Sequence, residues 1–355
     1  MAIREDDLGE LGDGRRVARF TLESPSGLRA QIVSHGGALV SLAVPDRAGR
    51  LDDVVLSFDD LAGYAGGRGY LGALIGRYAN RIAGARFVLD GTEHRLAANE
   101  GQNHLHGGLR GFDKMVWAAT PRSTPSGPAL ELAYASAHGE EGYPGNLSVR
   151  ATYTLEADAL RIDYAATTDR DTVVNLTNHT YWNLAGHAAG SILGHRLVID
   201  ADRFAAIGPG LIPTGELRAV DGTPFDFRQE AAIGARIDDG DEQLRLAGGY
   251  DHSFAIDGGG GLRRAARVLE PTSGRVLEVL TTEPAVQLYT GNYLDGMRGK
   301  AGAIYHRRTG FCLETQHHPD SPNQPAFPTT TLRAGAWYRS ATVYRFTIEP
   351  PGAAG

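Results

Sequence analysis

The chain has 355 residues, a formal net charge of -7 and a hydrophobic fraction of 42%, which is enough for a sizeable core. Lysine and arginine are scattered along it, so the sequence shows no basic footprint for nucleic acid. Its single cysteine, Cys312, excludes an internal disulfide. The start is acidic, and no apolar run approaches the roughly 20 residues of a membrane span. We therefore expect a cytoplasmic protein without a signal peptide, a membrane partner or a nucleic-acid partner.

Strand-like alternation dominates the chain, and helical periodicity is scarce. Residues 28–44 read as two strands broken at Gly36 and Gly37. Residues 149–164 alternate apolar and polar side chains on both sides of a short turn, which is typical of a β-hairpin with one wet face. Further strands are expected within 193–199, 276–289 and 342–348.

Glycine and proline divide these strands into short segments. The segment 120–128 is rich in Pro, Ser and Thr, and we interpret it as a surface loop. Residues 258–261 read as a turn, and 350–355 as a frayed tail. Many short strands with such turns predict an all-β fold built as a sandwich or barrel. No internal repeat or long linker interrupts the chain, so we expect a single domain over residues 1–355.

One glycine-rich string, residues 67–72, has the spacing of a dinucleotide fingerprint. That motif requires a strand before it and a helix after it, and the sequence offers no such context. We therefore interpret the string as a glycine-rich loop and expect no nucleotide cofactor.

A carboxylate at an expected strand end is the most informative single residue. Glu314 lies between Leu313 and Thr315, where an apolar run gives way to a polar loop. A half-buried carboxylate is costly unless it is paired or used, and burial raises its pKa toward the range suited to proton transfer. The segment alone leaves two interpretations open, a salt-bridged structural glutamate and a general base.

Two histidines, His104 and His106, fall on the same face of an extended segment. A metal site of the cupin kind needs a carboxylate a few residues later, but the next acid is Asp113. A histidine that forms hydrogen bonds is therefore favoured over a metal ligand, and we expect no metal.

Other segments combine aromatic rings with amides and charged groups. Asn80 and Arg81 interrupt an apolar run, and His179 lies in the string Asn-His-Thr-Tyr-Trp-Asn. Asp251 follows a tyrosine, and Gln287 lies between two apolar residues, where a buried amide must be hydrogen-bonded. Rings that stack on sugar C–H faces and amides that bind hydroxyls are typical of carbohydrate sites. Each segment alone also admits a structural interpretation.

Together these segments resemble the aldose 1-epimerase family, the galactose mutarotases. The resemblance extends from about Gly36 to Ile348, and its motifs occur in order at 76–82, 104–112, 175–186, 250–254, 284–292 and 310–324. It implies a large antiparallel β-sandwich, the supersandwich of the galactose mutarotases, with an active-site cleft on one broad face. It also implies interconversion of the α and β anomers of free aldohexoses such as galactose or glucose, without a cofactor.

The resemblance assigns roles by motif. It implies that Glu314 is the general base and His179 the general acid. It also implies a small-molecule sugar as partner, in a monomer or homodimer, and sugar contacts from Asn80, Arg81, His106, Asp251 and Gln287.

Two departures from the family pattern, Glu283 and the pair His317-His318, suggest a change at the cleft rim and leave the preferred sugar undetermined, but they do not affect the chemistry.

Two rival functions remain open. A hexose-phosphate 1-epimerase should carry a basic cluster for the phosphate, whereas Arg81 is the one basic candidate that we find for it in these motifs. A non-catalytic carbohydrate-binding protein would need neither His179 nor Glu314, so the presence of both favours the enzyme.

Overall fold

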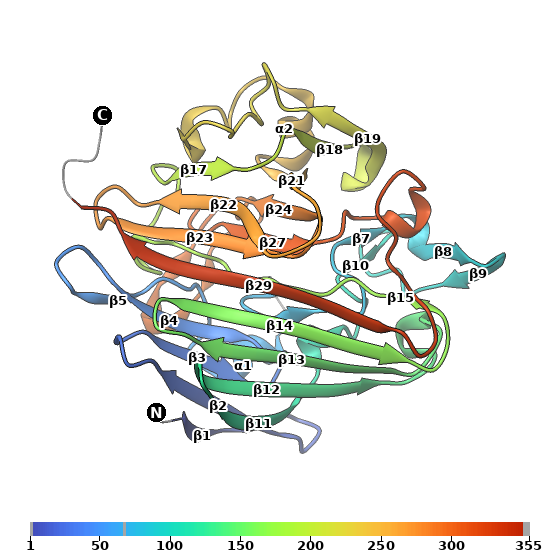
Figure 1. The fold of residues 1–355 in the computed structure, drawn as a ribbon, viewed down its shortest axis with the longest axis horizontal. Coiled ribbons are helices and arrows are strands. Elements are labelled where there is room, and N and C mark those ends of the chain that lie inside the picture. The colour runs from blue at the N-terminus through green and yellow to red at the C-terminus, as the bar shows by residue number, and fades with distance from the viewer. Residues whose placement is uncertain (1–2, 67–68, 351–355) are drawn as a thin grey trace.

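The computed structural model describes residues 3–66 and 69–350, whose regular secondary structure is mostly β-strand (Figure 1). The paired strands are antiparallel and build three main sheets, which confirms the predicted all-β sandwich. The described residues include two short α-helices, α1 (Leu61–Ala65) and α2 (Glu242–Ala247). No helix in this part of the chain has the length and apolar character to cross a membrane.

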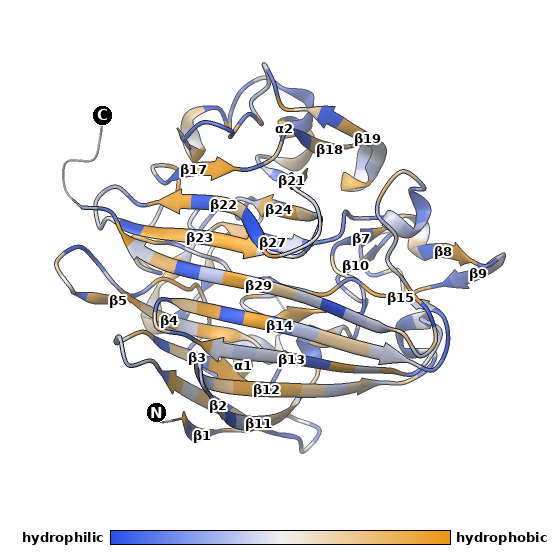
Figure 2. Cartoon of the chain, viewed as in Figure 1, coloured by the Kyte–Doolittle hydropathy of each residue, from blue (hydrophilic) through white to orange (hydrophobic). Residues whose placement is uncertain are grey.

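The largest sheet has nine strands. Their order across the sheet is β11 (Ala118–Thr124), β12 (Gly127–Ser136), β13 (Leu147–Leu155), β14 (Ala159–Thr168), β29 (Trp337–Ile348), β23 (Arg275–Thr281), β22 (Arg263–Leu269), β17 (Arg196–Ile199) and β20 (Ala231–Ala232). The predicted hairpin is β13–β14, closed where Leu155 pairs with Leu160. Buried and partly exposed residues alternate along β14, and Figure 2 shows the matching change of hydropathy along this strand.

The prediction of a surface loop at 120–128 was wrong. This segment forms most of β11 and the start of β12, and Pro121 pairs with Leu130. β11 is the edge strand of its sheet. Proline has no N–H to donate and is tolerated on an edge, so the proline-rich composition marked an edge strand.

The second sheet contains the N-terminal strands. They follow one another as β1 (Ile3–Glu10), β2 (Arg16–Glu23), β3 (Arg29–Val33), β4 (Leu39–Pro45) and β5 (Leu51–Asp53). β3 and β4 are the two strands predicted within 28–44, and the break between them has positive φ at Gly36 and Gly37. A Cβ on Gly36 would lie 2.5 Å from the carbonyl oxygen of Asp113, so the chain passes too closely there for any side chain.

The third sheet positions the functional residues. Its order is β19 (Pro213–Ala219), β18 (Arg203–Ile207), β21 (Asp251–Ala255), β24 (Ala285–Tyr289) and β27 (Cys312–Gln316). Every residue of β24 and β27 is buried. The predicted stretch 276–289 is therefore two strands in different sheets, because β23 ends at Thr281 and β24 belongs here.

One continuous apolar cluster joins all three sheets. It includes Leu22 of β2, Val149 of β13, Val286 of β24 and Tyr344 of β29. Short two-stranded ladders surround it: β6 (Leu74–Ile75) with β16 (Thr177–Asn178), β7 (Arg81–Ile82) with β10 (His104–Leu105), β8 (Arg86–Leu89) with β9 (Thr92–Arg95), β15 (Thr172–Val173) with β28 (Thr331–Leu332), and β25 (Met297–Arg298) with β26 (Ile304–Tyr305).

The glycine-rich string at 67–72 lies partly outside the described residues. Its described part, 69–72, forms turns after α1 rather than the strand-to-helix turn of a dinucleotide site. This finding agrees with a glycine-rich loop.

Candidate active site

A cleft of about 920 Å³ brings together most of the predicted site residues. Its lining includes Asn80, Arg81, His106, His179, Asp251 and Glu314. These residues come from five separate motifs, and the fold places them around one space.

Strand register explains why three of the polar groups share one face. In the third sheet Gln287 of β24 lies directly opposite Glu314 of β27, and Asp251 of β21 lies opposite Tyr289. Residues two apart on a strand point to the same side, so all three polar side chains share a face. Gln287 does not line the cleft. Its Nε2 donates to Asp251 Oδ1 at 2.7 Å, so it holds Asp251 in place.

Asn80, just before β7, and His106, just after β10, also line the cleft. The N–H of Asn80 donates to Nδ1 of His106 at 3.1 Å, and the N–H of His106 donates to the carbonyl oxygen of Asn80 at 3.0 Å. Both residues have positive φ, 62° and 49°, so this exchange fixes an uncommon backbone turn. Because Nδ1 of His106 accepts a hydrogen bond, the neutral ring carries its proton on Nε2 and offers the cleft a donor.

His106, His179 and Glu314 also form the one candidate metal cluster within the described residues, with potential ligand atoms all within 4.8 Å of one another. A neutral imidazole has a single unprotonated nitrogen, and in His106 that nitrogen accepts the Asn80 N–H. Ligation through Nε2 would require an imidazolate. The donor set therefore does not fit a metal ion.

The two predicted catalytic groups are neighbours. Nε2 of His179 lies 3.7 Å from Oε1 of Glu314, and both side chains are almost fully buried, with exposures of 5% and 2%. The other carboxylate oxygen, Oε2, has no hydrogen-bond partner among the described residues. The other ring nitrogen of His179, Nδ1, lies 3.5 Å from the sulfur of Cys312. Tyr70 and Tyr181 stack against the His179 ring at centroid distances of 5.8 and 5.0 Å.

Burial sets the protonation of this pair. Burial, reinforced by the negative charge of Asp251, raises the pKa of Glu314 well above its ordinary value. Burial lowers the pKa of His179 to about 4. These directions favour a pair in which Glu314 holds a proton beside a neutral His179 ring.

Asp251 has a raised pKa for the same reason, burial, and the nearby Arg81 opposes this shift.

Sequence reasoning missed Glu100. Its carboxylate accepts hydrogen bonds from Nε and Nη2 of Arg81, each at 2.7 Å, and the residue lines the cleft. The available signal was an acid four residues before the motif that begins at His104. It also missed Tyr70 and Tyr293, which reach the cleft on loops whose positions the sequence alone does not fix.

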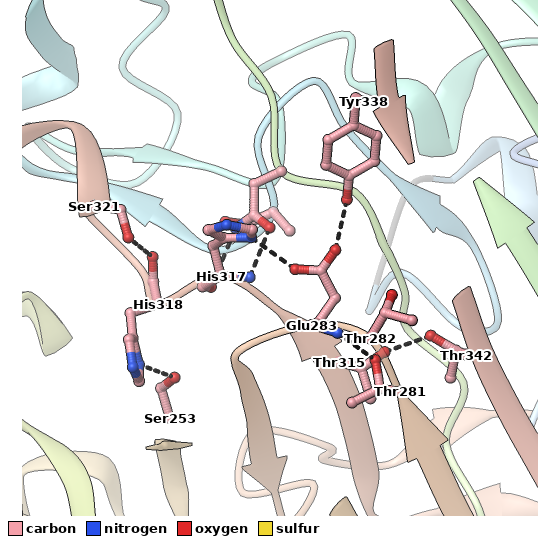
Figure 3. A network of polar contacts seen from close by, with 12 residues as sticks. Ser253, Thr281, Thr282, Glu283, Thr315, His317, His318, Ser321, Tyr338 and Thr342 are labelled. Atoms are coloured by element: carbon pink, nitrogen blue, oxygen red, sulfur yellow. Dashed lines mark hydrogen bonds and ion pairs between the residues drawn. The ribbon is translucent and has the colours of Figure 1, made fainter. Parts of the chain in front are cut away.

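The two departures from the family pattern do not lie where we predicted. Figure 3 shows Glu283 between His317 and Tyr338, with His318 bonded to Ser253. Glu283 and His318 are buried, and neither they nor His317 line the cleft. The prediction that they alter the cleft rim was wrong, because both departures fall just outside the ends of β24 and β27 and bond there.

Comparisons with known proteins identify the family of the chain. The family model described as aldose 1-epimerase matches residues 18–345. A galactose mutarotase from Bos taurus is 48% identical over 339 residues, covering 95% of this chain and 96% of its own. An aldose 1-epimerase from Escherichia coli is 37% identical over 341 residues, covering 95% and 97%.

A solved structure of galactose 1-epimerase from Lactobacillus acidophilus superposes with a TM-score of 0.87 at 27% identity. The superposition covers 98% of this chain and 99% of that protein. Both the sequence and the fold therefore match across nearly the whole length. The chain belongs to the aldose 1-epimerase family, and its activity is the interconversion of aldose anomers.

Proposed function

We propose that the chain interconverts the α and β anomers of free aldohexoses such as galactose or glucose, with Glu314 as general base and His179 as general acid. The observation that carries this proposal is the buried pair with 3.7 Å between Nε2 of His179 and Oε1 of Glu314. The pair lies in a cleft that also contains Asn80, Arg81 and Asp251.

The reaction moves two protons and breaks one bond. Glu314 removes the proton of the C1 hydroxyl while His179 gives a proton to the ring oxygen, and the bond between C1 and the ring oxygen breaks. Rotation about C1–C2 then turns the other face of the aldehyde toward the C5 hydroxyl. Ring closure reverses both proton transfers, so each side chain returns to its starting state. Each positioned acid or base typically contributes about 10²–10⁴-fold.

The pair needs only one proton throughout this cycle. Ring opening starts with ionised Glu314 and protonated His179, and it ends with protonated Glu314 and neutral His179. The second arrangement is the one that the pKa directions of the two groups favour. Burial favours the proton transfers of ring opening, since they relieve a buried carboxylate and a buried cation, but the shared proton must first pass from Glu314 to His179 to form the ionised pair.

The other polar groups suit the binding of sugar hydroxyls. Asp251 accepts hydrogen bonds, whereas Arg81 and Nε2–H of His106 donate them. We infer that Asn80, Arg81, His106 and Asp251 contact the sugar and that Gln287 acts through Asp251. Their contacts hold one end of the sugar while the C1–C2 region rotates.

Proton NMR of freshly dissolved α-D-galactose and α-D-glucose tests the function directly. We expect the purified protein to bring the anomers to equilibrium faster than buffer does, in proportion to its concentration. A carbohydrate-binding protein without activity would leave the rate unchanged. A hexose-phosphate 1-epimerase would accelerate a hexose 6-phosphate more than the free sugar, which would reverse our ranking.

We further propose that the protein acts in the cytoplasm as a single-domain monomer or homodimer, with neither nucleic acid nor membrane as a partner. The scattered basic residues and the net charge of -7 support the part of this proposal that concerns nucleic acid.

A further inference from the structure

We propose that Glu100 makes the cleft select neutral aldoses and reject anionic ones such as uronates and sugar phosphates. This inference rests on the proposed function, and it identifies a residue that determines its specificity. The starting point is the state of Arg81, the buried arginine of the cleft wall.

Arg81 is already paired. Two of its three guanidinium nitrogens, Nε and Nη2, donate to the two carboxylate oxygens of Glu100 at 2.7 Å. The third, Nη1, lies 3.8 Å from Oδ2 of Asp251. A guanidinium binds a carboxylate or phosphate through such a bidentate pair of hydrogen bonds. Glu100 therefore already uses the two donors of Arg81 that an anionic substrate would need.

Glu100 is held firmly enough to keep this position. Its backbone N–H donates to the carbonyl oxygen of Asn103 at 3.1 Å, and the N–H of Asn103 donates back at 2.9 Å. The side chain of Asn103 in turn accepts the N–H of Gly84 at 3.0 Å. The side chain of Glu100 is 34% exposed and that of Arg81 is 8% exposed, so the pair lies at the boundary between cleft and solvent.

The rest of the cleft is also acidic. Among the described lining residues, six carboxylic acids face two arginines: Asp59, Asp60, Glu100, Asp251, Asp295 and Glu314 against Arg81 and Arg298. A neutral sugar gains from such a surface, because carboxylates accept hydrogen bonds from its hydroxyls. An anionic sugar loses its hydration and meets like charge, while the positive charge of Arg81 is already neutralised.

The test compares D-galacturonate with D-galactose as substrates for the wild type and Glu100→Gln. Glutamine keeps the shape and one acceptor oxygen but leaves the charge of Arg81 available. We expect the ratio of kcat/KM for galacturonate to that for galactose to rise roughly 10- to 100-fold, as removal of a like charge a few ångström away predicts. We also expect inorganic sulfate to inhibit galactose turnover more strongly in Glu100→Gln than in the wild type.

Two control variants isolate the cause. Glu100→Asp keeps the charge beside Arg81, so its ratio should stay near that of the wild type. Asp295→Asn removes one charge from the same cleft, while Glu100 still holds Arg81, so its ratio should also stay low. An unchanged ratio and unchanged sulfate inhibition in Glu100→Gln would overturn the inference, as would an equal rise in Asp295→Asn. Absence of galactose interconversion in the wild type would instead contradict the proposed function.

Discussion

Two buried side chains, Glu314 and His179, determine whether the cleft can move protons. Neither is held by a strong hydrogen bond in the described residues: Nε2 of His179 lies 3.7 Å from Oε1 of Glu314, and Oε2 of Glu314 has no partner. A buried carboxylate without a firm partner is costly to stability and is typical of a group kept for chemistry.

Replacement of either catalytic residue should therefore remove transition-state stabilisation. Glu314→Gln keeps the shape but loses the proton acceptor, and His179→Asn keeps some hydrogen bonding but cannot deliver a proton. Each should lower kcat by roughly 10²-fold or more with a small change in KM. The double variant should be little worse than either single variant, because the two groups act as one unit. Polarimetry measures both constants, and near-normal kcat in folded Glu314→Gln would show that the carboxylate is structural.

The pH profile should follow the pKa directions of the pair. Below the pKa of His179, about 4, the pair takes a second proton and Glu314 cannot accept one, so the rate falls. Above the raised pKa of Glu314 the pair loses its only proton, so the rate falls again. The wild type should thus keep a plateau between the two values.

In His179→Asn the residual rate depends on ionised Glu314 alone. This rate should rise as the pH passes the raised pKa of that carboxyl. The acid limb of the profile, the range in which the rate falls at low pH, should therefore lie at higher pH than in the wild type. Measurement of kcat/KM against pH for both proteins, corrected for spontaneous mutarotation, checks this shift. An acid limb at the same pH in both would assign that limb to Glu314 in the wild type as well.

The tautomer of His106 leads to a separate expectation about metals. Nδ1 of His106 accepts the N–H of Asn80, so the ring faces the cleft as a donor. Dialysis against a chelator should leave the rate of galactose interconversion unchanged. Loss of activity that a divalent ion restores would contradict the acid–base mechanism and the tautomer together.

The sequence predicted the cleft residues better than their partners. Motif order located Glu314, His179 and Asp251, but Glu314 lies buried in the middle of β27 rather than half-buried at a strand end as we predicted. The place of Glu100 four residues before the motif at His104 did not reveal its role, because that role depends on the pairing of β7 with β10 that brings Arg81 beside it. A contact between two short ladders is decided by tertiary structure rather than by local pattern.

At the scale of elements, the relative position of β24 and β27 sets the active-site geometry, because Gln287 and Glu314 are direct cross-strand neighbours. Just outside both strands, Glu283 joins them: its Oε2 contacts Nδ1 of His317 at 2.6 Å, and its Oε1 accepts the hydroxyl of Tyr338 at 2.9 Å (Figure 3). This contact ties the ends of β24 and β27 to β29 outside the cleft lining.

Removal of this clamp should cost stability more than activity. Glu283→Ala leaves His317 and Tyr338 without their shared partner and should lower the free energy of unfolding by about 3 kcal/mol. Glu283→Gln, the matched control, keeps an acceptor and should lose less. Urea unfolding followed by circular dichroism measures both. Glu283 does not line the cleft, so a large fall in kcat with unchanged stability would contradict a structural role.

Alternation of apolar and polar residues predicted strands correctly where one face of the sheet is exposed to solvent. It did not predict sheet membership where neighbouring strands are both mostly apolar. The alternation in 149–164 gave the hairpin β13–β14 because that sheet has a solvent face. The sequence did not show that the run 276–289 contains two strands of different sheets, because β23 and β24 are both rich in buried apolar residues and only three residues separate them. Periodicity cannot tell which sheet a buried strand joins.

At the scale of the whole molecule, the cleft depends on all three sheets being in place. Trp182 illustrates the connection: its backbone bridges Val55 on one side and Phe311 on the other, and its ring packs on Tyr344 and Phe346 of β29. Trp117 lies elsewhere in the core, against Phe112 and against Tyr134 of β12. The two buried tryptophans therefore report on different parts of one apolar cluster.

We expect these parts to unfold together, because no sheet buries its apolar face without the others. Trp117→Phe/Trp337→Phe leaves Trp182 as the reporter, and Trp182→Phe/Trp337→Phe leaves Trp117. In each variant, fluorescence and far-UV circular dichroism should give the same urea midpoint. Galactose at ten times its Kd should raise the free energy of unfolding by about 1.4 kcal/mol at both reporters. Separate midpoints, or a galactose effect at one tryptophan alone, would divide the chain into independent units and contradict a single domain.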